Sequence, residues 1–445
     1  MLLRIAAVWL IPSQPVSDFL DYYQHALSVY RTARYGGAMH PPAYPLLLAS
    51  GFFLARGLHT LAVAKLVNCA LGGATILVGA LMARKLWGDH AGLFAALLSS
   101  LYPRYILTVC VLASENLFAP LLLLFVFFSV LASRSRFSPR KAMLGGAVSG
   151  LLTLTRSIAY FLGFVWLLST IVARKRPRPV LLEIVLFLTL QHTVMLPWAI
   201  RNHLAIGRFT FLSTTGGMGL FNGNNPHATG GWYDWREDLE QVSPGILKKS
   251  HVEIDDVARA AALDWMRHHP VQAAKLYLEK LRLIAVQDTL IADWSIFGVL
   301  PWPHPFKNHP RIVRLVLRIA SGAVVALAAI GLLALFGKAR RSRSPVDWSI
   351  AWTLLAAVAY VPLLSALIAV NGRYRWPVED LLIPVAASLL ASRPVAAALE
   401  NFGGTHCSDS LQQDRRSASQ DIGGDVHFAG KIHRVGVLLR RITCR

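Results

Sequence analysis

The sequence predicts an all-α polytopic membrane protein, and three observations support this fold class. Of the 445 residues, 54% are hydrophobic and only 16% are charged, a balance far from that of a soluble domain. Apolar segments close to the length that crosses a bilayer as a helix recur along the chain. Short runs of Lys and Arg separate them, as in cytoplasmic loops of membrane proteins. The net charge of +21 therefore reflects loop composition, and no basic soluble domain is present to favour nucleic-acid binding.

About ten membrane spans are expected. Nine candidate segments are 61–82, 90–108, 112–131, 142–154, 158–172, 180–200, 312–336, 348–370 and 378–391. The first apolar segment, 1–11, is too short to cross a bilayer alone. Either part of the first helix is missing from the sequence, or this helix is short, tilted or interfacial. Segment 44–54 is also short. The loops fall on alternate sides of the membrane, with the basic runs inside, only if this segment does not cross and instead enters from the outer face as a half-helix.

The charge pattern divides the chain into four regions. The basic runs at 133–141, 174–178 and 338–343 are placed inside. This orientation gives an N-terminal membrane half (1–200) with a first outer loop (13–45), an outer soluble insertion (201–311) and C-terminal membrane helices (312–392). The tail, 393–445, has too little apolar content for a core and is expected to be disordered in the cytoplasm.

The insertion is expected to be a small mixed α/β unit. Segment 209–225 is predicted to be extended and rich in turns, because it contains a Thr-Thr-Gly-Gly run and a Gly-Asn-Asn-Pro run. Segment 252–284 has apolar residues at helical spacing and is broken at Pro270, so two helices are expected there. The four cysteines show no metal spacing, and Cys69 and Cys110 are interpreted as packing residues.

Ionisable side chains gather where the spans meet the outer face. A charge beside an apolar helix is costly unless it pairs with another group or contacts a substrate, so each of these residues is a functional candidate. A carboxylate such as Asp18 near apolar surface can have its pKa raised toward the working range of a base. Arginine is suited to bidentate phosphate contact. The candidates are Asp18, Tyr22, His40, Glu115, Arg156, Arg373 and Arg375.

Alternative interpretations remain open for the acidic and histidine candidates. Asp18 could cap the helix expected at 19–30, for which Ser17 and Asp18 are suitable residue types. Glu115 could form an ion pair with Arg104 that only joins two spans. His40 could be a solvated loop side chain.

Alternative interpretations also remain for the three arginines. Arg156, Arg373 and Arg375 could extend their charged ends toward the membrane surface, with no substrate role.

Several short motifs occur in one order along the chain. Asp18 precedes Tyr22 by four residues, and a Pro-Pro-Ala-Tyr-Pro turn ends the first outer loop at 41–45. Ser114-Glu115 begins a span. A Pro-Trp-Ala-Ile-Arg-Asn sequence at 197–202 is followed by Gly-Asn-Asn-Pro at 223–226.

Over 4–390 these motifs resemble the GT-C superfamily of bacterial membrane glycosyltransferases, which includes protein O-mannosyltransferases and aminoarabinose transferases. Met39 stands where that family has a Glu and His40 where it has a cation. This departure puts in doubt a second catalytic carboxylate in the loop and any metal site that depends on it.

The resemblance implies a GT-C-like fold and an integral glycosyltransferase of a bacterial inner membrane. Such an enzyme moves a hexosyl or pentosyl group from a polyprenyl-phosphate carrier to a glycan, lipid or protein acceptor at the outer face. It implies that Asp18 is the catalytic carboxylate and that the other candidates bind donor phosphate or substrate. No motif supports a divalent cation. The alternative class is a lipid-linked sugar flippase or transporter, but such proteins commonly have internal symmetry and discontinuous midplane helices.

Overall fold

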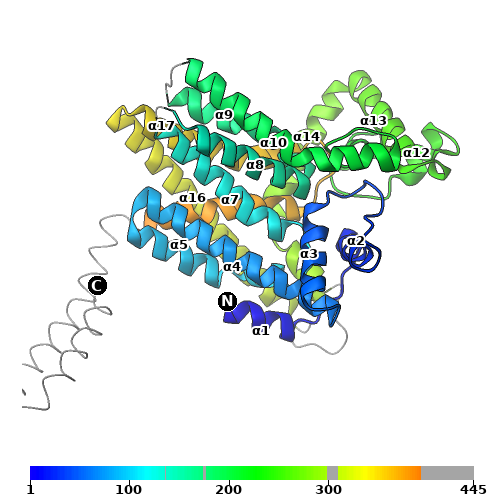
Figure 1. The fold of residues 1–445 in the computed structure, drawn as a ribbon, viewed down its shortest axis with the longest axis horizontal. Helices are drawn as coiled ribbons and strands as arrows, with labels where there is room; N and C mark the ends of the chain where they lie inside the picture. Colours follow the sequence, from blue (N-terminus) through cyan, green and yellow to red (C-terminus); the bar gives the residue numbers. More distant parts are fainter. Residues whose placement is uncertain (136, 174–176, 298–308, 392–445) are drawn as a thin grey trace, which may run out of the picture. The chain divides into compact units, whose positions relative to one another are not determined.

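Helices form nearly all of the ordered structure in a computed structural model of this chain. The structure describes residues 1–135, 137–173, 177–297 and 309–391. Between its helices the described chain contains only loops and one isolated β-bridge, between Gly231 and Val370. The tail expected to be disordered lies outside the described residues. Figure 1 shows the arrangement of the helices.

Five helices are long and apolar enough to cross a membrane, which makes the chain a multi-pass membrane protein. Each overlaps a predicted span. They are α4 (Thr60–Trp87), α7 (Glu115–Ser133), α10 (Pro177–Ile206), α16 (Pro310–Ser342) and α17 (Pro345–Ser365). Shorter helices accompany them: α1 (Leu2–Leu10), α3 (Ala43–Leu54), α5 (Asp89–Leu101), α8 (Pro139–Thr155), α9 (Gly163–Val172) and α18 (Trp376–Leu390). The total of about ten crossings stays a prediction.

Two predicted spans are not continuous α-helices. Segment 90–108 is divided into α5 and α6 (Pro103–Thr108), because Pro103 has no backbone N–H and holds Tyr102 in an extended conformation. Segment 158–172 begins as the 3₁₀ helix η1 (Ser157–Leu162) and continues as α9. Both breaks lie on the side of the bundle that carries the candidate residues. At each break the regular α-helix is interrupted, and this allows nearby charged side chains to point into the bundle.

The bundle is held together by a large aromatic and aliphatic core. Helices α7, α8, α9 and α10 pack around Phe125, Trp166 and Phe187, whose rings lie 5.3–6.3 Å apart. Gly146 on α8 permits close contact with α10, since a Cβ there would overlap the backbone carbonyl of Phe187. Helix α18 is packed on α4, α5, α16 and α17. Burial of this apolar surface fixes the helix ends that carry the polar residues.

The insertion is helical where the structure describes it, and the predicted extended conformation of 209–225 is wrong for part of that segment. Residues Gly216–Gly223 form α11 because Asp255, on α13 (His251–His268), accepts hydrogen bonds from the N–H groups of Gly217 and Met218. Asp255 is distant in the sequence, yet it supplies the hydrogen-bond acceptor that backbone N–H groups in the first turn of α11 would otherwise lack. No strand is present among the described residues of the insertion.

The two helices expected at 252–284 are present as α13 and α14 (Pro270–Val286). The insertion also contains α12 (Arg236–Val242), η2 (Ile246–Lys248), α15 (Leu290–Ala292) and the π-helix η3 (Asp293–Phe297).

The insertion is attached to the segment that links α17 to α18. Asn224 donates to the carbonyl of Leu367, and the amides of Ala369 and Val370 donate to Gly219 and Gly230. Fully buried Lys280 donates to Asn224 Oδ1, and burial lowers the pKa of this lysine to about 8. These contacts position the short helix η5 (Gly372–Arg375), which follows in the chain.

Candidate active site

Four charged residues from distant parts of the sequence meet at the ends of four elements. Asp18 is the first residue of α2 (Asp18–Thr32), Glu115 is the first residue of α7, Arg156 follows the last residue of α8, and Arg373 lies in η5. A carboxylate in the first turn of a helix is favoured by the helix dipole. The structure therefore brings together four of the predicted candidates.

Arg373 joins the two carboxylates. Its Nη2 donates to Asp18 Oδ2 at 2.5 Å, and its Nε lies 3.3 Å from Glu115 Oε1. Arg156 Nη1 approaches the same Glu115 oxygen at 2.5 Å. The side chains of Glu115 and Arg373 are only 3% and 12% exposed, whereas that of Asp18 is 20% exposed. The arrangement has two carboxylates and two guanidinium groups, with Asp18 nearest to solvent.

One donor of Arg373 is free within the described part of the chain. Its Nη1 atom is buried and has no hydrogen-bond partner there. The guanidinium carbon also lies 5.3 Å from the ring centre of Trp294 and 5.6 Å from that of Phe19, so aromatic faces hold it in place. A buried donor without a partner is costly, and an anionic ligand would satisfy it.

Tyr22 lies beside this cluster. Its hydroxyl is 3.4 Å from the Ser114 hydroxyl, which is also 3.4 Å from both Glu115 Oε2 and Arg156 Nη1. Burial, followed by the charge of Asp18, raises the pKa of Tyr22 to about 12. Tyr22 therefore stays protonated at neutral pH, and its hydroxyl accepts a hydrogen bond from Ser114. Ser114, which was not singled out from the sequence as a site residue, connects three of the candidates.

The expectation that apolar surroundings raise the pKa of Asp18 is wrong. Burial by itself would raise this pKa, but the charge and hydrogen bond of Arg373 and the charges of nearby cations outweigh burial and lower it. Asp18 is therefore ionised at neutral pH. Its carboxylate accepts from Arg373, and the helix-capping alternative for Asp18 is not supported, because Ser17 is the residue before the helix and makes no side-chain cap.

His40 is close to the cluster and is not a freely solvated loop residue. Its Nε2 lies 3.2 Å from Asp21 Oδ2, and its ring packs edge-on against Tyr22 with 5.1 Å between ring centres. The side chain of His40 is 16% exposed and that of Asp21 is 50% exposed. His40 thus forms one wall of the site next to the outer loop.

The Pro-Trp-Ala-Ile-Arg-Asn motif fixes the first outer loop to α10. Arg201 donates to the carbonyls of Tyr35 and Gly37, and its guanidinium carbon lies 4.9 Å from the centre of the Trp198 ring. Thr214 also donates its amide to the carbonyl of Ala38. These bonds hold the loop that ends in His40 against the bundle.

Arg375 does not join Arg373. It belongs to a second buried cluster, in which its Nε donates to Glu379 at 2.7 Å, while Arg104 donates to Glu379 at 2.7 Å and to Asp380 at 2.5 Å. The Arg104–Glu115 pair considered from the sequence is therefore not formed. None of the three candidate arginines extends to the membrane surface, since each side chain is 12–13% exposed and paired.

The second cluster was missed from the sequence, although a signal for it exists. Glu379 and Asp380 are adjacent carboxylates inside an apolar span, a pattern that marks buried partners or a functional site. Tyr102 and Ser321 also donate to Glu379, at 2.6 and 2.7 Å. The carboxylate of Glu379 thus has four donors, and the cluster fixes α18 to α6 and α16.

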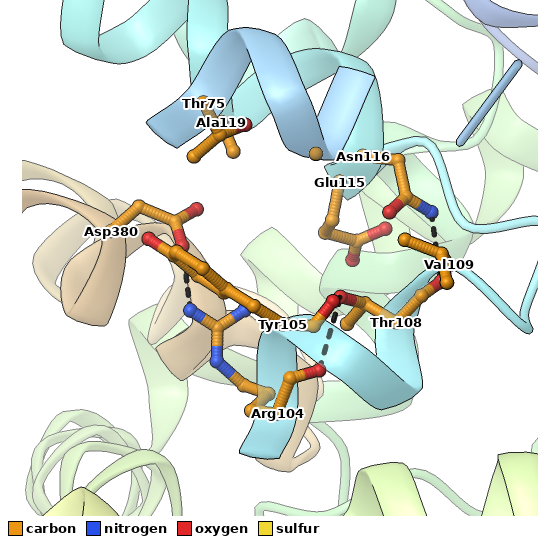
Figure 2. Close-up of a pocket in the computed structure, with 10 residues that line it drawn as sticks. Thr75, Arg104, Tyr105, Thr108, Val109, Glu115, Asn116, Ala119 and Asp380 are labelled. Atoms are coloured by element: carbon orange, nitrogen blue, oxygen red, sulfur yellow. Dashed lines mark hydrogen bonds and ion pairs between the residues drawn. The ribbon is translucent and has the colours of Figure 1, made fainter. Parts of the chain in front are cut away.

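A small cavity separates the two clusters. Figure 2 shows Glu115 from α7 and Asp380 from α18 at this cavity, beside the α6 turn that carries Arg104. The cavity volume of about 20 Å³ is sufficient for one water molecule. Glu115 therefore contacts the cations of the first cluster and also borders a space large enough for a water.

Comparison with solved structures identifies the fold. The archaeal oligosaccharyltransferase AglB from Archaeoglobus fulgidus, in complex with an inhibitory peptide and a dolichol-phosphate, matches 98% of this chain and 53% of its own length, with a TM-score of 0.51 and 13% identity. An oligosaccharyltransferase from Archaeoglobus fulgidus in complex with zinc and sulfate matches 92% of this chain and 51% of its own length, with a TM-score of 0.52 and 13% identity. ArnT from Cupriavidus metallidurans bound to undecaprenyl phosphate is less similar. It matches 90% of this chain and 78% of its own length, with a TM-score of 0.39 and 16% identity.

The resemblance to GT-C glycosyltransferases is thus confirmed at the level of the fold. The chain spans about half the length of the archaeal oligosaccharyltransferase that it matches. No protein-family model and no curated protein sequence matches the chain.

The described residues do not fit a metal ion such as the zinc bound in the archaeal complex. No group of three or more His, Cys, Asp or Glu side chains is assembled among them to hold a metal. The two carboxylates of the first cluster are already engaged by Arg373 and Arg156. A divalent cation placed between Asp18 and Glu115 would face two guanidinium charges, so no chemical step is assigned to a metal.

Proposed function

We propose that this protein is an integral membrane glycosyltransferase that moves a sugar from a polyprenyl-phosphate carrier to an acceptor at the outer face of a bacterial inner membrane. The observation that carries this proposal is the Asp18–Arg373–Glu115–Arg156 cluster. It combines an ionised, partly exposed carboxylate with a buried guanidinium donor that has no partner among the described residues. The fold shared with an oligosaccharyltransferase in complex with a dolichol-phosphate supports the proposal.

Arg373 and Arg156 are proposed to bind the donor phosphate. Arginine donors match phosphate oxygens in geometry and charge. A phosphate oxygen that bonds to Arg373 Nη1 would also draw the guanidinium charge away from Asp18. Donor binding would then weaken the Asp18–Arg373 pair and leave the carboxylate free to accept a proton.

Asp18 is proposed to act as the general base. The acceptor hydroxyl oxygen attacks the anomeric carbon of the donor sugar, and the bond from that carbon to the phosphate oxygen breaks. The hydroxyl proton passes to Asp18, and polyprenyl phosphate leaves with its charge held by Arg373 and Arg156. Tyr22, Ser114 and His40 are proposed to orient the sugar and acceptor hydroxyls.

The experiment is transfer of radiolabelled sugar from a polyprenyl-phosphate sugar by purified protein in detergent. Asp18→Asn keeps an oxygen that can accept from Arg373 but cannot accept the proton. We expect kcat to fall about 10²-fold or more. Asp18→Glu keeps the charge but displaces it by one methylene, and we expect an intermediate rate.

Asp21→Asn is the matched control, because Asp21 is one turn away, is half exposed and contacts His40 rather than Arg373. Its effect should be mild. Transfer at the wild-type rate by Asp18→Asn would assign the base to another residue, with Glu115 the next candidate. Movement of the lipid-linked sugar across vesicle membranes without transfer would favour the flippase alternative.

A further inference from the structure

A second hollow lies at the end of the bundle where α9 and α16 finish and α17 begins. Its volume is about 720 Å³. Figure 1 shows α9 and α17 next to each other at this end. Helix α17 has 21 residues and is therefore about 30 Å long, and η5 with Arg373 follows soon after its other end. The hollow and the candidate active site are thus separated by about the thickness of a bilayer. The hollow is lined by Ile171, Val172, Arg340, Arg343, Pro345, Trp348 and Trp352.

The hollow carries positive charge, and no carboxylate is among its described lining residues. The guanidinium groups of Arg340 and Arg343 make no ion pair or hydrogen bond with any residue that the structure describes. The neighbouring carboxylate, Asp347, is already engaged by Lys338 at 3.3 Å and by the Ser342 hydroxyl at 2.8 Å. Two cations about one helical turn apart in the sequence therefore face a space that an anion can enter.

The opposite wall is aromatic and apolar. The rings of Trp348 and Trp352 pack against Phe336 of α16, with 5.8 and 5.2 Å between ring centres, so their positions are fixed. Trp352 remains 40% exposed. Tryptophan at the end of a membrane helix is typical of the lipid headgroup level. An apolar wall beside two free cations suits a molecule with an anionic head and a hydrocarbon chain.

We propose that this hollow binds the phosphate of an anionic glycerophospholipid. Arg340 and Arg343 would donate to the phosphate oxygens, and an acyl chain would lie along Trp352 and Ile171. Basic pockets between membrane helices bind anionic headgroups in this way. The inference goes beyond the proposed transfer reaction, because the hollow shares no residue with the Asp18–Arg373 cluster and would bind a structural lipid rather than a donor.

The test is native mass spectrometry of the full chain in a neutral detergent. Dioleoyl phosphatidylglycerol is the probe, and dioleoyl phosphatidylcholine at the same concentration is the comparison. We expect one phosphatidylglycerol to be retained in preference to phosphatidylcholine. The variant Arg340→Gln with Arg343→Asn should weaken retention by about tenfold or more, since each cation near a headgroup contributes about fivefold. Asn is chosen because Arg343 has a φ of 52°, a left-handed conformation that Asn tolerates.

Arg341→Gln is the matched control, because Arg341 lies between the two arginines in the sequence and does not line the hollow. It should leave retention and melting temperature unchanged. Equal retention of phosphatidylcholine, or wild-type retention by the double variant, would overturn the proposal. Release of phosphatidylglycerol by an equal concentration of inorganic phosphate would assign the hollow to a soluble anion and would also overturn it.

Discussion

At the scale of single residues, Arg373 determines the electrostatics of the candidate active site. It pairs with Asp18 and Glu115 at once, through different nitrogen atoms, and keeps one further donor free within the described chain. A lysine ammonium is a point charge on a flexible stem and cannot reproduce these separate contacts. The geometry of the guanidinium group is therefore as important here as its charge.

Arg373→Lys is expected to raise the donor KM by about tenfold or more, because a hydrogen bond to a charged group contributes about 1.5–3 kcal/mol. Steady-state transfer assays at varied donor concentration would measure this. Arg282→Lys is the control, since Arg282 is 61% exposed and its only ion-pair partner among the described residues is Glu279 in α14. An Arg373→Lys protein with unchanged donor KM would place phosphate binding elsewhere.

The lowered pKa of Asp18 leads to a prediction about pH. A carboxyl group with a pKa lower in the folded than in the unfolded state stabilises the fold above its unfolded pKa, about 3.9 for Asp, and this contribution is lost as pH falls through the folded value. The melting-temperature difference between wild type and Asp18→Asn should therefore be constant from about pH 5 to 8. It should shrink only below about pH 4.

Differential scanning fluorimetry of both proteins in one detergent would measure this difference. A wild-type melting temperature that rises relative to that of Asp18→Asn as pH falls from 7 to 5 would show that the pKa of Asp18 is raised. It would also restore the interpretation of Asp18 as a base with a pKa near the working pH.

At the scale of elements, the sequence predicts helices better than it predicts their ends. Apolar periodicity and Pro270 correctly predicted α13 and α14, and each of the five long helices overlaps a predicted span, with ends displaced by up to about six residues. The conformation of 209–225 depends on Asp255, about 30 residues or more away in the sequence, so local turn residues could not reveal α11. Similarly, Arg375 is two residues from Arg373 in the sequence but pairs with Glu379, a partner that composition does not identify.

The position of η5 depends on a close contact at Gly372. A Cβ atom on this residue would overlap the backbone carbonyl oxygen of Gln287, which directly follows α14. Gly372→Ala must therefore displace η5, which carries Arg373. We expect transfer to fall about tenfold or more, because small misplacements of binding groups are costly to catalysis.

Gly216→Ala is the control, because a Cβ atom there meets no heavy atom within 4 Å and the residue has no positive φ. It should leave both transfer rate and melting temperature nearly unchanged. Comparison of the two variants in the same transfer and melting assays separates the contact at Gln287 from a general effect of losing a glycine. Normal transfer by Gly372→Ala would show that the position of η5 is not critical.

At the scale of the whole molecule, the charges are separated along the bundle axis. The Asp18–Arg373 cluster lies where α2, α7, α8 and η5 meet, while Arg340 and Arg343 lie at the far end of α17. Positive charge at one set of loops predicts the cytoplasmic side. The fold and the charge pattern together favour a site that opens at the opposite membrane surface.

The topology prediction follows from this separation. Single cysteines at positions 17 and 229 should react with a membrane-impermeant maleimide in intact cells, and one at position 342 should react only after the membrane is opened. All three native side chains are exposed, so whether each cysteine is labelled depends on the side of the membrane that it faces.

The background for this experiment should carry Cys407→Ser and Cys444→Ser, while Cys69 and Cys110 are buried and can remain. Labelling of position 342 in intact cells, with protection of positions 17 and 229, would invert the topology. The Asp18–Arg373 cluster would then face the cytoplasm, and transfer at the outer face would be excluded, because a sugar acceptor there could not reach Asp18. The predicted pattern would leave the cluster facing the outer compartment, where a lipid-linked sugar and its acceptor can meet.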